Sequence, residues 1–184
     1  GGHTLHHKRL HNTDSGFLQT EIEGSFLWLQ QLLGKTPVSF CFPGGVYTKA
    51  AIAAAFQYGY KVVRTTELLS TSTAHDGELM PTTLQLYEHS SLTYVKHLLK
   101  RQKWISLSKF LRAPFKINLQ QLTHYYLDTL ETGDCFHLWG HSWELEEQGL
   151  WQKLEAVLSI ISNRPDFTYI TNGQIPTATT ATNY

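Results

Sequence analysis

The sequence predicts an α/β fold, in which a parallel sheet with helices outside it is either open or closed into a barrel. Short runs rich in apolar, β-branched and aromatic residues predict strands. Amphipathic helical patterns separate these runs, and parallel strands need such crossover connections. Two of the runs end in unusual residues, and folds of this class place their chemistry at the carboxyl ends of strands. The predicted strands are 38–42, 61–65, 84–87, 135–139 and 167–171. We expect 38–42, 61–65 and 135–139 to be neighbouring inner strands.

The first half of the chain alternates regularly. Residues 14–33 place apolar side chains at helical spacing, and Gly34 ends the pattern. After the strand at 38–42, Thr48 is expected to cap a helix, and Gly59 is expected to end it. The strand at 61–65 follows at once.

The second half is less regular at its start. Residues 67–83 are rich in Ser, Thr and Gly and predict no long element. A helical stripe follows at 92–99, and Asn118 is expected to cap a helix that Gly133 ends. The last helix is predicted at 150–161.

Length and composition predict one domain, residues 1–174, followed by a flexible tail of low complexity at 175–184. No apolar run of about 18 residues predicts a membrane span. The 15 basic and 15 acidic residues give no net charge, so the sequence predicts no positive surface that would bind nucleic acid. A neutral glycan is compatible with such a surface. Cys41 and Cys135 lie in apolar runs and are expected to be buried thiols rather than a disulfide.

Histidines cluster in the sequence His3-Thr4-Leu5-His6-His7. Neutral imidazole is the commonest protein ligand for zinc-like metals, and the spacing of His3 and His7 allows both to reach one ion. The alternative is that these are solvated histidines near a chain end. The glutamate of a zinc-protease HExxH motif is absent.

Residues 42–47, Phe-Pro-Gly-Gly-Val-Tyr, follow the first predicted strand. Two glycines there allow the backbone to approach a ligand closely, and an exposed N–H could stabilise an oxyanion during acyl transfer. The alternative is an ordinary proline-glycine turn.

Residues 137–144, His-Leu-Trp-Gly-His-Ser-Trp-Glu, follow the strand at 135–139. A strand that ends in His and Trp offers a proton donor and an apolar wall. The alternative is that the aromatic residues belong to the core and that His141 bonds the backbone.

Together and in this order, these features resemble the polysaccharide deacetylases, the family-four carbohydrate esterases with a chitooligosaccharide-deacetylase homology domain. The resemblance covers essentially the whole sequence. The family's His-(Ser/Thr)-x-x-His motif matches residues 3–7, and its strand leading into a Pro-x-Gly turn matches 41–47. Its helix closing in Gly-Tyr and a strand ending in Arg-Thr match 58–65, and its terminal Thr-Asn-Gly matches 171–173.

The resemblance implies a distorted (β/α) barrel that hydrolyses an N-acetyl, or sometimes O-acetyl, group on a glycan. It implies that His3 and His7 bind a divalent metal, with zinc expected and cobalt or nickel as alternatives. The Gly44 N–H would hold the oxyanion, and His141 would protonate the leaving amine. We therefore expect His3 and His7, rather than His6, to face the same cavity as Gly44 and His141. The implied substrate-binding residues are Pro43, Gly45, Tyr47, Leu138 and Trp139.

Three departures from the family pattern qualify these expectations. The Asp-Asp motif that supplies the third metal ligand and the general base is expected upstream of Gly1, which would leave the barrel incomplete at its first strand. Cys41 stands where many members have arginine. The family's Leu-x-His needs one extra residue to reach His141, so His137 is a rival for the acid role.

Two further hypotheses therefore remain beside the deacetylase. One is a non-catalytic carbohydrate-binding relative, and the other is an inactive core fragment of such an enzyme. The 184 residues alone are expected to be inactive.

Overall fold

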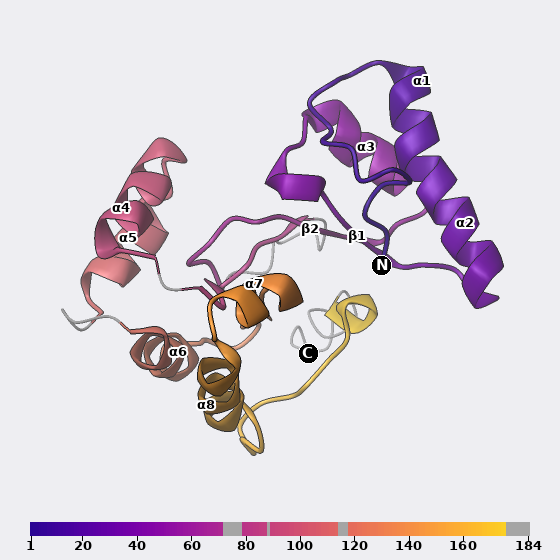
Figure 1. Cartoon of the computed structure of the whole chain (residues 1–184). Helices are drawn as coiled ribbons and strands as arrows, with labels where there is room; N and C mark the ends of the chain where they lie inside the picture. The colour runs from indigo at the N-terminus through magenta and orange to yellow at the C-terminus, as the bar shows by residue number, and fades with distance from the viewer. Residues whose placement is uncertain (72–78, 88, 114–117, 176–184) are drawn as a thin grey trace. The chain divides into compact units, whose positions relative to one another are not determined.

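The computed structural model describes residues 1–71, 79–87, 89–113 and 118–175 (Figure 1). The chain forms two compact units. The N-terminal unit comprises Gly1–Thr66, Thr73–Pro81 and Tyr169–Tyr184, and the second unit comprises Glu67–Ser72 and Thr82–Thr168. The domain boundary expected at residue 174 stays a prediction, and residues 176–184 of the expected tail lie outside the described ranges.

A long helix opens the N-terminal unit, as the pattern at 14–33 predicted. It consists of α1 (Ser15–Leu18), a π-helical segment η1 (Gln19–Glu23) and α2 (Gly24–Leu33). Asp14 caps it by accepting a hydrogen bond from the Phe17 N–H at 2.7 Å, and Gly34 ends it in a left-handed conformation. The π segment was not predicted, because it changes only one turn of an otherwise regular apolar stripe.

A three-stranded parallel sheet lies in the same unit, in the order β1 (Ser39–Cys41), β2 (Val62–Arg64) and β3 (Leu79–Met80). The strands predicted at 38–42 and 61–65 are therefore confirmed as neighbours, with Phe40 opposite Val63. Gly2 forms a parallel bridge to Phe40 on the other side of β1. The strand β3 was not predicted.

The turn and helix after β1 follow from local signals. The 3₁₀ turn η2 (Pro43–Gly45) leads to α3 (Lys49–Gln57), which Thr48 caps by accepting from the Ala51 N–H at 3.2 Å. Alanines at the buried positions of α3 allow it to pack closely on the sheet. The buried core residues of this unit are Leu10, Leu18, Ile22, Phe40, Phe42, Ala51, Ala54, Ala55, Tyr60 and Val63.

The second unit contains two short parallel strands, β4 (Leu84–Gln85) and β5 (Leu138–Trp139), with Leu84 opposite Leu138. Asn118 caps one of its helices in a capping box with Gln121, as predicted. The helices are α4 (Ser91–Lys100), α5 (Trp104–Leu111), α6 (Leu119–Asp128), α7 (Ser142–Glu147) and α8 (Trp151–Ile161).

The α/β class is thus confirmed, whereas both described sheets are small and unclosed. The hydrogen-bonded neighbour of β5 is β4, so the prediction that 135–139 pairs beside β1 and β2 is wrong for the described strands. The strand predicted at 167–171 is also wrong. Tyr169 and Ile170 are exposed there, so they lack the half-buried packing that their β propensity normally reflects. The residues that follow form the 3₁₀ turn η3 (Asn172–Gln174).

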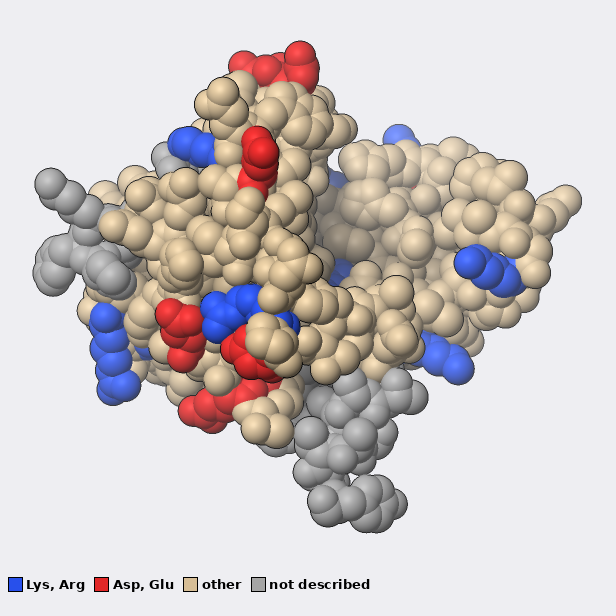
Figure 2. Space-filling model, turned by 90° about the horizontal axis from the view of Figure 1, so that it is seen from below, with Lys and Arg blue, Asp and Glu red and all other residues tan. Residues whose placement is uncertain are grey.

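The described surface agrees with the charge balance of the sequence. On the face drawn in Figure 2, acidic and basic groups are interspersed among neutral residues. Within the described ranges, every helix is too short or too polar to cross a membrane. Neither Cys41 nor Cys135 forms a disulfide.

Candidate functional site

The N-terminal loop brings two of its three histidines together. The ring centroids of His3 and His7 lie 4.9 Å apart, with the ring planes tilted by 54°. Both side chains are exposed. The spacing of four residues therefore places these two imidazoles side by side, as the sequence predicted, and His6 makes a different set of contacts.

The backbone at the end of β1 orients His3. Its Nδ1 lies 2.7 Å from the Cys41 carbonyl oxygen. A carbonyl oxygen only accepts, so Nδ1 carries the proton and the ring lone pair lies on Nε2. Metal-binding histidines commonly show this arrangement, in which one ring N–H donates to a carbonyl and the other nitrogen coordinates. The His3–His7 pair thus fits two imidazole ligands of a divalent metal.

His6 turns instead to a buried carboxylate on the π-helical segment. Glu21 is only 4% exposed and accepts from the His6 backbone N–H at 3.0 Å and from His6 Nδ1 at 2.9 Å. Its backbone carbonyl also accepts from the Leu5 N–H at 2.9 Å. Burial alone would raise the pKa of the Glu21 carboxyl, but hydrogen bonds from His6 and the Thr4 side chain lower it below its ordinary value.

Sequence reasoning missed Glu21. The available signal was its position three residues after Leu18, which places a carboxylate on the buried face of the predicted helix. A charged residue is rarely fully buried without a partner.

The histidine loop is also held in an unusual backbone conformation. Thr4 and His7 have φ angles of 61° and 56°, in the left-handed region. Thr4 is β-branched, which makes this conformation a genuine outlier. The Thr4 hydroxyl accepts from the Lys8 N–H at 3.0 Å and so closes the loop on itself.

The turn after β1 exposes a backbone donor. Gly44 and Gly45 both have positive φ, of 61° and 65°. The Gly45 N–H bonds the Phe42 carbonyl at 2.9 Å, whereas the Gly44 N–H has no acceptor within the described part of the chain. Pro43 is buried and Gly44 is exposed, and Tyr47 stacks on Phe42 with ring centroids 4.7 Å apart.

An open pocket of about 400 Å³ adjoins the histidine loop. His3 and His6 line it together with residues of α2. Neither His7 nor Gly44 is among its lining residues, so it is not the shared cavity that the sequence predicted. The lining residues are Gly1, His3, Thr4, Leu5, His6, Ser25, Trp28 and Leu29. The described residues include no group of three His, Cys, Asp or Glu side chains that could hold a metal by themselves.

In the second unit, His141 follows the carboxyl end of β5 and occupies the N-cap of α7. Its ring packs between those of Trp139 and Trp143, with centroid separations of 4.9 and 5.4 Å. The Trp139 Nε1 is buried and has no hydrogen-bond partner among the described residues. Leu138 packs against the core of the unit.

Polar groups that the sequence did not single out also lie beside β4 and α7. Gln85 Nε2 donates to Glu144 at 3.4 Å, and the Gln85 amide oxygen lies 3.1 Å from His89 Nε2. Burial lowers the pKa of His89, and the Glu144 carboxylate opposes that shift.

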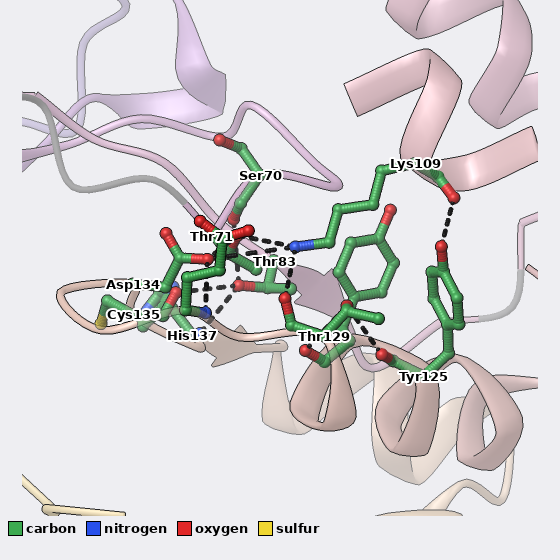
Figure 3. A network of polar contacts seen from close by, with 11 residues as sticks. Ser70, Thr71, Thr83, Lys109, Tyr125, Thr129, Asp134, Cys135 and His137 are labelled. Carbon is green, nitrogen blue, oxygen red and sulfur yellow. Dashed lines mark hydrogen bonds and ion pairs between the residues drawn. The ribbon is translucent and has the colours of Figure 1, made fainter. Parts of the chain in front are cut away.

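His137, the rival acid, lies before β5 and has its backbone tied into a polar network (Figure 3). Its N–H donates to Thr83 Oγ1 at 3.0 Å, and its carbonyl accepts from the Thr83 and Leu84 N–H groups at 3.0 and 3.1 Å. Lys109 Nζ donates to the Thr129 carbonyl at 3.0 Å and lies 4.0 Å from the Asp134 carboxylate. The network fixes the approach to β5 and therefore the position of the residues that follow it.

The predicted site residues are thus divided between the two units. His3, His7, Pro43, Gly44, Gly45 and Tyr47 lie in the N-terminal unit, and Leu138, Trp139 and His141 lie in the second. The structure places the ring of His3 beside that of His7 and the ring of Trp139 beside that of His141, and the convergence of the two groups on one substrate stays a prediction.

Comparison with known proteins matches parts of the chain to a family model and to solved structures. Residues 1–63 match the family model described as polysaccharide deacetylase. A Streptococcus pyogenes deacetylase, PplD, solved in complex with acetate, matches with 23% identity and a TM-score of 0.41 over 44% of this chain. The match spans 36% of that structure's chain, so this chain covers about a third of its length. No curated protein matches the sequence.

Proposed function

We propose that the chain is part of a metal-dependent hydrolase of acetylated glycans, and the match of residues 1–63 to the polysaccharide deacetylase family model supports this proposal. The observation that carries the proposal is the His3–His7 pair, held against the end of the strand that leads into the Gly44 turn. An N-acetylated amino sugar is the expected substrate, with an O-acetylated glycan as the alternative.

The metal would be a divalent ion, with zinc expected and cobalt or nickel as alternatives. His3 and His7 would supply two ligands, and we expect an aspartate outside residues 1–184 to supply the third. When bound, such an ion lowers the pKa of water toward neutrality and polarises the acyl carbonyl.

The chain's own residues would act on the acyl group and on the leaving group. The Gly44 N–H would donate to the carbonyl oxygen as negative charge develops on it. As the water oxygen bonds to the acyl carbon, the water would lose a proton to the carboxylate base expected outside residues 1–184. The C–N bond would then break, and the amine nitrogen would take a proton from the imidazolium of His141. We favour His141 over His137 because His141 follows the carboxyl end of β5, whereas His137 precedes the strand.

Three further assignments belong to the same proposal. Leu138 and Trp139 would form the apolar wall around the acetyl group, and Pro43, Gly45 and Tyr47 would contact the substrate. The two small parallel sheets would be parts of a distorted (β/α) barrel that a strand carrying the Asp-Asp motif completes.

The test measures acetate release from N-acetylglucosamine oligomers with added zinc, cobalt or nickel. Residues 1–184 alone should give no release above background, because two imidazoles bind metal weakly and no carboxylate base is assigned. A longer chain that includes an upstream Asp-Asp strand should release acetate and lose that activity on His3→Ala or His7→Ala. His11→Ala, at an exposed histidine of the same segment, is the matched control and should remain active.

Two outcomes would contradict this proposal. Robust activity of residues 1–184 would show that another carboxylate acts as the base, with Asp14 tested first and Asp76, which lies outside the described residues, tested second. An inactive longer chain that still binds metal would favour the non-catalytic carbohydrate-binding relative.

A further inference from the structure

Glu21 is a buried carboxylate that the proposed reaction does not use. It lies in η1, where the helix changes from α to π geometry, and its side chain is 5% exposed. Burying a charge is costly unless hydrogen bonds compensate for it. The hydrogen bonds of known geometry to Glu21 come from two consecutive residues of the histidine loop, Leu5 and His6.

These contacts bind two consecutive residues of the histidine loop to Glu21. The Glu21 backbone carbonyl accepts from the Leu5 N–H, and the carboxylate accepts from the His6 N–H and from His6 Nδ1.

The histidine loop needs such support because its backbone is strained. Left-handed conformations at non-glycine residues are unfavourable and persist only where surrounding contacts over-determine them. Thr4 and His7 both adopt this conformation, one on each side of the residues that Glu21 binds. It is this backbone path that returns His7 to within 4.9 Å of His3, ring centroid to ring centroid.

We propose that Glu21 is a positioning residue for the His3–His7 pair: by holding Leu5 and His6 against the π-helical segment, it presents the two imidazoles to one ligand. This inference rests on the proposed function for the identity of that ligand, a divalent metal. Glu21 itself would contact neither metal nor substrate.

The test compares Glu21→Ala with a matched control on the same segment. Glu23→Ala removes a carboxylate that bonds only Gln19 among the described contacts, at 2.7 Å. In residues 1–184 without metal, NMR should detect nuclear Overhauser contacts between the His3 and His7 rings in the wild type and in Glu23→Ala. Glu21→Ala should lose them. Calorimetric titration with Zn²⁺ should then show roughly a 10–100-fold weaker affinity for Glu21→Ala, the loss typical when a residue that orients a metal ligand is removed.

Retention of the ring contacts and of the zinc affinity, within about twofold, in a folded Glu21→Ala protein would overturn the proposal. If Glu21→Ala loses its helical circular dichroism, Glu21→Gln replaces it, because the amide keeps the shape and one acceptor oxygen while losing the charge. Weakened ring contacts in Glu21→Gln support the positioning role, and unchanged contacts contradict it. If a longer chain with the upstream Asp-Asp strand also binds no zinc, the proposed function fails, while the metal-free ring contacts in residues 1–184 still decide the role of Glu21.

Discussion

His3 Nδ1 lies 2.7 Å from the carbonyl oxygen of Cys41, so the backbone of residue 41, rather than its side chain, orients the histidine. The same residue donates its N–H to the Gly2 carbonyl at 3.0 Å. Both bonds are independent of the side chain at position 41. Cysteine at this position, where many family members have arginine, therefore leaves the hydrogen bond between His3 and the backbone of residue 41 intact.

Cys41→Ala should accordingly keep the His3–His7 geometry. We expect the zinc affinity of the variant to stay within about twofold of wild type, since its main-chain bonds are retained. Nitrogen-15 NMR of the imidazole should show the Nδ1–H tautomer of His3 in both proteins. A tenfold loss of affinity, or a change of tautomer, would show that the thiol contributes to the site.

The elements that the sequence predicted well are those fixed by local signals. Thr48, Asn118 and Gly34 mark helix ends because capping side chains and left-handed glycines act within a few residues of themselves. The side-by-side placement of His3 and His7 was also predicted from spacing alone.

The features that the sequence did not reveal depend on partners distant in the chain. Leu79 and Met80 form a strand only because β2 offers them an edge, and the run around Tyr169 forms none. Glu21 appeared as one more acidic helix residue until its contacts to Thr4 and His6 were known. Hydrogen-bond partners of this kind carry no periodic signal along the chain.

We predict that alanine substitutions at Gly34 and Gly45, two glycines with similar φ angles, differ in the stability that they cost. Gly34 and Gly45 have φ of 63° and 65°, but a Cβ at Gly34 would meet open space, whereas one at Gly45 would overlap Thr66 Oγ1. Gly34→Ala should cost only the left-handed penalty, roughly 1–2 kcal/mol. Gly45→Ala should lower the free energy of unfolding by more, as measured by urea denaturation. Equal losses would mean that the turn relaxes around the new methyl group.

Two adjacent tyrosines on α6 should respond oppositely to loss of the hydroxyl. Tyr125 donates to the Lys109 carbonyl at 2.6 Å, so Tyr125→Phe should lower the free energy of unfolding by about 0.5–1.5 kcal/mol. The Tyr126 ring is fully buried, and its hydroxyl has no partner in the described part of the chain. Tyr126→Phe should therefore be neutral or stabilising. A loss in Tyr126→Phe equal to that of Tyr125→Phe would reveal a partner for the second hydroxyl.

His97 on α4 predicts acid sensitivity of the second unit. Its Nε2 is buried without a partner among the described residues. Burial lowers the pKa of His97. The pKa is lowered further by the positive charges of Arg101 and Lys100 and by the neighbouring His89. The negative charge of Glu67 opposes these effects. Below the ordinary histidine pKa of about 6.5, the unfolded chain therefore binds a proton that the folded chain resists. The free energy of unfolding should rise with pH until the solution passes that value and then level off.

His97→Gln should flatten this rise between about pH 5 and 7, because the variant has no proton to bind at this position. A part of the slope should remain, since burial also lowers the pKa of His89. Glu67 affects stability at lower pH than His97 does. Its bonds to Lys103 and Arg101 lower the pKa of its carboxyl against the effect of burial. The stabilisation by the Glu67 carboxylate is therefore present above the ordinary carboxyl pKa and is lost as the pH falls below that value. Urea unfolding at several pH values measures the slope, with His124→Gln, at an exposed position on α6, as the matched control. A slope in His97→Gln identical to that of the control would mean that His97 takes up its proton equally well in the folded chain.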